Sequence, residues 1–171
     1  MTELSLGSGS LVFTGTDVSF EPAIISLQNS IINGLITTLR QITTANGFKT
    51  NVVKVLRGVR GLDDFTSADM PGLAIFRATH NPDTQYYYGT IGTQYYRIWG
   101  YTKVEARSNN YDNLDNLVSD VEEVLMSSTY NLYQSDTVID STSFYEGGVQ
   151  DSYGFFNMGV KVSYCHDLDT A

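Results

Sequence analysis

The chain has 171 residues, of which 42% are hydrophobic and 12% are aromatic. This length and composition predict one globular domain with its own core and exclude a disordered chain. The net charge is −9, and the basic residues form no cluster, which argues against nucleic-acid binding and against adhesion to anionic membranes. The twelve tyrosines suit a surface that meets other proteins, or simply reflect that tyrosine is a good strand residue.

Cysteine occurs once, as Cys165. An intramolecular disulfide is therefore impossible, and a reducing compartment is expected. The start of the chain has no signal-peptide pattern, and no apolar run approaches the roughly 18 residues of a membrane-spanning helix. We expect no membrane association.

Residues 1–19 are predicted to form an extended N-terminal arm ahead of a single domain over 20–171. The arm holds the linker-like stretch GSGS at 7–10 and the short apolar piece LVFTG at 11–15. Such an arm is either a frayed terminus or a strand donated to a neighbour.

The first helix is predicted between the capping residue Ser19 and the terminating Gly47, with Pro22 in its first turn. Its apolar residues recur at steps of three or four, in one row of Ile24, Leu27, Ile31, Leu35, Leu39 and Ile42 and a second row of Ile25, Ile32 and Ile36. Two adjacent rows make a broad apolar face that a sheet, a partner subunit or both must cover.

Three strands are predicted next, at 49–57, at 72–79 and around RIWGYTKV at 97–104, and we interpret them as a meander. Residues 58–71 have loop composition, and 80–94 are predicted to be a hairpin tip. In the third strand the period of two places Arg97, Trp99, Tyr101 and Lys103 on one face and Ile98, Gly100, Thr102 and Val104 on the other. Only the second of these faces resembles an ordinary core.

A second helix at 112–128, with Asp112 as its N-cap, has one clean apolar face and carries its acidic residues on the opposite side. Strands at 136–146 and 155–165 follow, and the last strand alternates strictly between apolar and mixed positions. The predicted fold is therefore α+β: a mainly antiparallel, mixed sheet with two helices packed on one face, in the order α-β-β-β-α-β-β.

Reactive clusters are scarce in the sequence. The two histidines, His80 and His166, lie about half the chain apart, and CHDLD at 165–169 is the one place where metal ligands gather. Adjacent residues of a strand point to opposite faces, so Cys165 and His166 are poorly placed to bind one ion together. We predict no catalytic residue, no metal and no cofactor, and hence a binding or assembly protein rather than an enzyme.

Several phrases carry a resemblance, namely ITTANGFKTNVVKVLRG, DMPGLAIF, YRIWGYTKV, YDNLDNLVSDVEEVL and MGVKVSYC, in this order between Glu21 and Tyr164. Together they resemble the tail terminator, or tail-completion, proteins of long-tailed bacteriophages. The long leading arm departs from the compact start of that family and leaves open a neighbouring connector family.

The resemblance implies a six-membered ring of identical subunits on the head-proximal end of the tail tube. Such a ring stops tube polymerisation and supplies the docking surface for the head connector. It implies a place in the tail or neck of the virion, reached from the host cytoplasm during assembly. A net-acidic ring would let DNA pass without binding it.

A cyclic ring needs two different complementary patches on each subunit. The predicted candidates are the strand face of Tyr95, Arg97, Trp99 and Tyr101, the second helix row of Ile25, Ile32 and Ile36, and the arm residues Leu11, Val12 and Phe13. Two alternatives stay open. One is a head–tail connector or stopper subunit, and the other is a small enzyme or ligand-binding module that stacks a sugar or base on Trp99 and Tyr101. Trp99 could also pack under loops of its own subunit.

Overall fold

A computed structural model describes residues 21–86, 89–103, 110–131, 133, 136–145 and 153–166. Its elements are α1 (Glu21–Leu39), β1 (Lys54–Arg57), β2 (Gly72–Tyr86), β3 (Gly89–Lys103), α2 (Asn110–Met126), β4 (Thr137–Tyr145) and β5 (Tyr153–His166). The strands form one sheet in the order β1-β2-β3-β5-β4, with β1 parallel to β2 and the other pairs antiparallel. The predicted α+β class, mixed sheet and element order are confirmed.

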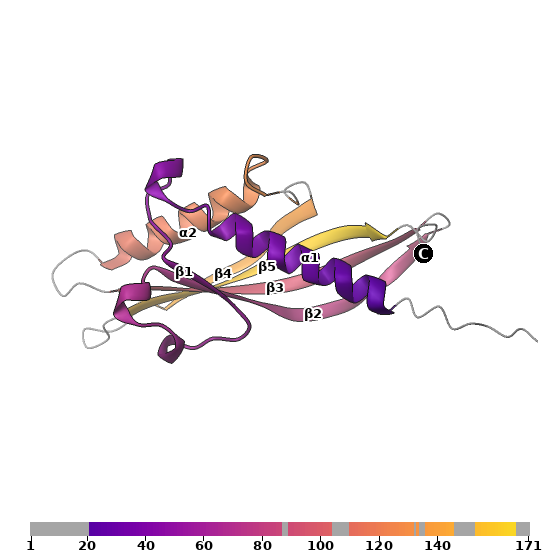
Figure 1. The fold of residues 1–171 in the computed structure, drawn as a ribbon, viewed down its shortest axis with the longest axis horizontal. Coiled ribbons are helices and arrows are strands. Elements are labelled where there is room, and N and C mark those ends of the chain that lie inside the picture. The colour runs from indigo at the N-terminus through magenta and orange to yellow at the C-terminus, as the bar shows by residue number, and fades with distance from the viewer. Residues whose placement is uncertain are drawn as a thin grey trace, which may run out of the picture.

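Both helices pack on the same face of the sheet, here called the helix face (Figure 1). Helix α1 contacts β1 and β2, whereas α2 contacts β3, β5 and β4, and the two helices also contact each other. Each helix thus covers about one half of the face.

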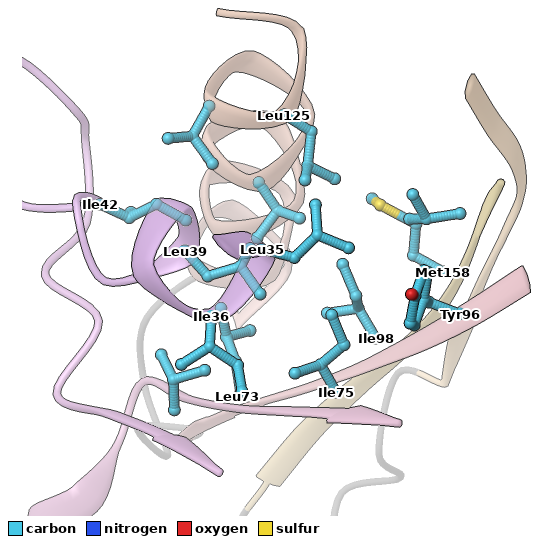
Figure 2. Close-up of a cluster of buried hydrophobic side chains, with 14 of the residues drawn as sticks. Leu35, Ile36, Leu39, Ile42, Leu73, Ile75, Tyr96, Ile98, Leu125 and Met158 are labelled. Carbon is cyan, nitrogen blue, oxygen red and sulfur yellow. The ribbon is translucent and has the colours of Figure 1, made fainter. Parts of the chain in front are cut away.

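The core fills the space between the helices and the sheet, where side chains from both layers point toward one another (Figure 2). It includes Leu35 and Leu39 of α1, Leu125 of α2, Leu73 and Ile75 of β2, Tyr96 and Ile98 of β3, and Met158 of β5, all fully buried. Burial raises the pKa of the Tyr96 phenol. Strand β5 alternates as predicted, with Phe156, Met158, Val160, Val162 and Tyr164 buried.

Gly100 leaves space in the core for the ring of a neighbouring strand. The ring of Phe156, on the paired strand β5, lies where the Cβ of a side chain at position 100 would be. Only glycine leaves room for this ring on the helix face.

Asp120 joins α2 to the segment that precedes β1. Its carboxylate is fully buried and accepts hydrogen bonds from the backbone N–H of Lys49 at 3.1 Å and of Thr50 at 2.7 Å. The Thr50 hydroxyl donates a further bond at 2.7 Å. These bonds satisfy the buried charge.

The first helix and the first strand are shorter than predicted. Helix α1 ends at Leu39, and Gly47, with φ of 93°, closes a separate 3₁₀ turn over Thr44–Asn46. The Asn51 side chain accepts the Thr44 N–H at 2.8 Å and so replaces a helical bond. Strand β1 begins only at Lys54, because the preceding N–H groups donate elsewhere: those of Lys49 and Thr50 to Asp120, and that of Val52 to the carbonyl of Ile42.

The predicted meander was wrong for β1, and the hairpin tip, which does lie within 80–94, is shorter than predicted. Strand β1 runs parallel to β2, and residues 58–71 form the connection that this requires, with 3₁₀ turns at Leu62–Asp64 and Ser67–Asp69. Most of 80–94 belongs to β2 and β3, which extend to Tyr86 and from Gly89. The turn-forming residues Pro82 and Asp83 are accommodated at a register shift between Asn81 and Thr84.

Candidate functional site

Among the described residues, only one end of the sheet surface opposite the helices is covered by another segment. There the connection 58–71 folds back over the strands (Figure 1) and builds a second, smaller core. It consists of the buried Phe65, Ala74 and Tyr101, with Leu56, Leu62, Met70, Trp99 and Phe155 packed around them at partial exposure.

Tyr101 is the centre of this small core. It is only 5% exposed, and its ring lies 5.1 Å from that of Phe65 and 5.3 Å from that of Phe155, between ring centroids. The phenol donates a hydrogen bond of 2.9 Å to the carbonyl oxygen of Arg60, and burial raises its pKa. Tyr101 therefore holds the connection onto the sheet and is not available to a ligand.

Lys54 and Asp69 fasten the other end of the connection. Their side chains form an ion pair of 3.0 Å, and the Lys54 ammonium lies 5.7 Å from the centre of the Phe65 ring. Asp69 also accepts bonds from the backbone N–H and the hydroxyl of Thr66, at 2.8 and 2.9 Å. The Thr66 backbone bond and then the Lys54 bond lower the pKa of Asp69 from 3.8 to about 2.

Beyond the covered end lies an uncovered area that we call the open face. It comprises Phe76 of β2, Tyr95, Arg97 and Trp99 of β3, and Phe155 and Asn157 of β5, each partly exposed. The Trp99 indole meets the Phe76 ring edge-on at 4.9 Å and the Phe155 ring at 5.8 Å, between centroids. An aromatic strip thus crosses three strands in the middle of the sheet.

Arg97 extends this strip toward the β4 edge. The register places Phe76, Arg97, Gly159 and Ser141 in one row across the sheet. The guanidinium passes over Gly159, where an added Cβ would lie 3.1 Å from Nη1, and donates a bond of 3.2 Å to Ser141 Oγ. Gly159 therefore lets a charged side chain lie flat on the sheet.

The predicted interface residues fall into three groups. Tyr95, Arg97 and Trp99 share the open face, whereas Tyr101 of the same strand is buried beneath the connection. Ile32 and Ile36, at 2% and 9% exposure, belong to the core of the subunit, so this helix row is not the free patch we expected. Helix α1 needs this second apolar row because it packs against both the sheet and α2. The side chain of Ile25 and the arm residues Leu11, Val12 and Phe13 lie outside the described part of the chain.

Phe76, Phe155 and Gly159 are the members of this surface that the sequence did not single out. The alternation of β5 places Phe155 and Gly159 on the side away from the core. Their contact with Trp99 and Arg97 depends on strand register, which alternation alone does not give.

Catalytic groups do not converge in the described part of the chain. His80 is paired with Gln94 and His166 with Thr90, so the histidines flank β3 about 13 Å apart along the strand. The described residues contain no group of three or more His, Cys, Asp or Glu that could hold a metal ion.

A cavity of about 420 Å³ lies between the segment before β1, the connection 58–71 and the end of β3. Lys49, Thr50, Ser67 and Lys103 are among its lining residues, and no histidine, cysteine or carboxylate is.

Neither described helix is long and apolar enough to cross a membrane. A scan of known protein families finds no family that matches the chain, and a search of curated proteins finds no match either.

Proposed function

We propose that the protein is a structural, non-enzymatic subunit of a ring that caps the head-proximal end of a phage tail tube. The ring ends tube polymerisation and presents the surface to which the head connector binds. The subunit is assembled in the host cytoplasm and becomes part of the tail or neck of the virion.

The observation that carries this proposal is the open face. Tyrosine, tryptophan and arginine are the residues that most often anchor protein interfaces, and Tyr95, Trp99 and Arg97 lie together there, each partly exposed. The aromatic strip is also rigid, because Trp99 is held between Phe76 and Phe155. A pre-ordered surface loses little entropy on binding.

The resemblance noted in the sequence supplies the kind of assembly. Its quoted phrases fall on the segment between α1 and β1 together with β1, on β2, on β3, on α2 and on β5, and the order of these elements agrees with the fold that the resemblance implies. The net charge of −9 fits a ring whose channel passes DNA without binding it.

A connector or stopper subunit remains the second candidate, because it too forms rings and would use the same face. A module that stacks a sugar or base on Trp99 and Tyr101 is disfavoured. Tyr101 is buried under the connection 58–71, and its hydroxyl is bonded to Arg60.

Native mass spectrometry of the protein, alone and mixed with tail-tube protein, tests the proposal. We expect a sixfold species, either free or formed on tube ends. A monomer in both samples would overturn the proposal, and a ring that binds the head connector but never the tube would favour the connector subunit.

Two charge reversals test the role of the open face. Arg97→Glu should abolish the ring but leave the monomer folded, because the only described bond of the Arg97 side chain is the exposed one to Ser141. Arg40→Glu is the matched control, because Arg40 is an exposed arginine on the turn after α1, far from this surface. Equal loss of assembly in both variants would show a general charge effect instead.

Trp99 provides a second readout, since it is the only tryptophan of the chain. Burial of the open face should shift its fluorescence to shorter wavelength as the ring forms. The shift should be absent from Arg97→Glu and present in Arg40→Glu.

A further inference from the structure

Strand β4 forms one edge of the sheet and pairs, within the described residues, only with β5. A strand edge offers unpaired backbone N–H and C=O groups to any extended segment that reaches it. The opposite edge, β1, is shorter, with four residues, and its Arg57 side chain reaches back to Asn29 and Asn33 of α1. The β4 edge is the better acceptor.

A register shift between Ile139 and Ser141 divides β4 into two parts. The shift and the exposed Asp140 protect the first part, because bulges and charges discourage pairing at an edge. The second part, Ser141–Tyr145, is regular and carries no charge or proline. Phe144 projects from it with 50% of its surface exposed.

We propose that Ser141–Tyr145 accepts residues Leu11–Phe13 of a neighbouring copy as an added strand. This inference rests on the proposed ring for the presence of that neighbour, and it names a second contact besides the open face. Leu11, Val12 and Phe13 are the apolar stretch of the otherwise polar residues 7–17. Their backbone would complete the edge, and their side chains would cover Phe144.

Chain length favours a neighbour over the same subunit. Seven residues separate Phe13 from Glu21, and fully extended they span about 24 Å. The Tyr96 hydroxyl contacts the carbonyl of Gln28, so the first residue of α1 lies about 10 Å farther along the helix, away from Tyr145. The β4 edge is three strands, or about 14 Å, from β2, and α2 lies across that route. Together these two distances already use the full reach of the segment, before any detour around α2 is counted.

Photo-crosslinking tests the contact directly. Phe13 is replaced by p-benzoylphenylalanine in the full chain, and labelled and unlabelled copies are mixed before irradiation. We expect crosslinks from position 13 to 141–145 that join a labelled to an unlabelled chain. Crosslinks within one chain, crosslinks to other segments, or none at all would overturn the inference.

Paired variants measure how much the added strand contributes to ring assembly. Val12→Pro removes a backbone donor and should weaken assembly about tenfold or more, whereas Ser8→Pro in the linker should not. On the acceptor, Phe144→Lys should have the same effect, and the control is Val59→Lys, because Val59 is 64% exposed in the connection 58–71. Rings unchanged by Val12→Pro and Phe144→Lys would refute the strand while leaving the proposed ring intact. A wild-type chain that crosslinks at 141–145 but never closes a ring would refute the ring instead.

Discussion

The two faces of the sheet are built from the same strands but are covered to different extents. On the helix face, α1 and α2 bury side chains of the central strands such as Tyr96, Ile98 and Phe156. On the other face, the connection 58–71 covers Tyr101 and stops short of Trp99 and Arg97. Along β3, buried residues of the helix face thus alternate with partly exposed residues of the open face. The comparison predicts that substitutions at neighbouring positions affect different properties.

The largest contrast is expected between Ile98 and Arg97. Ile98→Ala removes a fully buried side chain and should lower the free energy of unfolding by about 2–5 kcal/mol. Arg97→Ala removes a partly exposed side chain whose one described bond is to Ser141, so it should change this free energy by less, about 1 kcal/mol or below, and should instead weaken assembly. Denaturant unfolding of the monomers measures both. A similar loss in the two variants would mean that the open face belongs to the stability core.

Substitution of Gly100 tests how tightly the side chains on the helix face are packed. Gly100→Ala places a methyl group against the Phe156 ring and should cost about 1–3 kcal/mol through overpacking. Gly61→Ala, in the connection, meets no atom within 4 Å and should be neutral within about 0.5 kcal/mol. If Gly100→Ala were also neutral in the denaturation curve, the sheet and Phe156 would have room to adjust.

Substitutions of Tyr101 and Tyr95 compare the covered and the open ends of the face opposite the helices. Tyr101→Phe keeps the ring contacts, loses the bond to Arg60 and should cost about 1 kcal/mol. Tyr95→Phe changes the same residue type on the open part of the strand and should be close to neutral. Thermal unfolding should show a larger loss of stability in Tyr101→Phe than in Tyr95→Phe. A larger loss in Tyr95→Phe would contradict the assignment of the covered and open ends.

The smallest effect is expected at Asp69. Its pKa is about 2 in the folded chain and 3.8 ordinarily, so its carboxylate stabilises the fold above pH 3.8. This contribution fades as the pH falls from 3.8 through 2, because the unfolded chain takes up the proton first. The stability difference between wild type and Asp69→Asn should therefore shrink over this range. A difference that stays constant with pH would show that Asp69 acts through packing alone.

The sequence predicted the elements better than their partners. Alternation in β5 and the single apolar face of α2 identified their buried positions, because each strand or helix carries its own period. The direction of β1 and the true size of α1 could not be read in this way. Ile32 and Ile36 seemed surplus to one helix face, yet they are buried because α1 packs against α2 as well as the sheet.

The candidate site was predicted in part for the same reason. The period of two placed Arg97, Trp99 and Tyr101 together, but it could not show that Phe65, far away in the sequence, covers only Tyr101. Nor could it place Gly159 beneath Arg97, since that contact follows from register. Contacts between segments that are far apart in the sequence could not be predicted.

The buried carboxylate of Asp120 has a consequence for local motion. The backbone N–H groups of Lys49 and Thr50 lie outside regular structure, yet both donate to this residue of α2. Their amide hydrogens should exchange with solvent slowly, at rates set by the detachment of α2 rather than by opening of their own segment. In Asp120→Asn the same two amides should exchange markedly faster, while those of the central strands keep their protection.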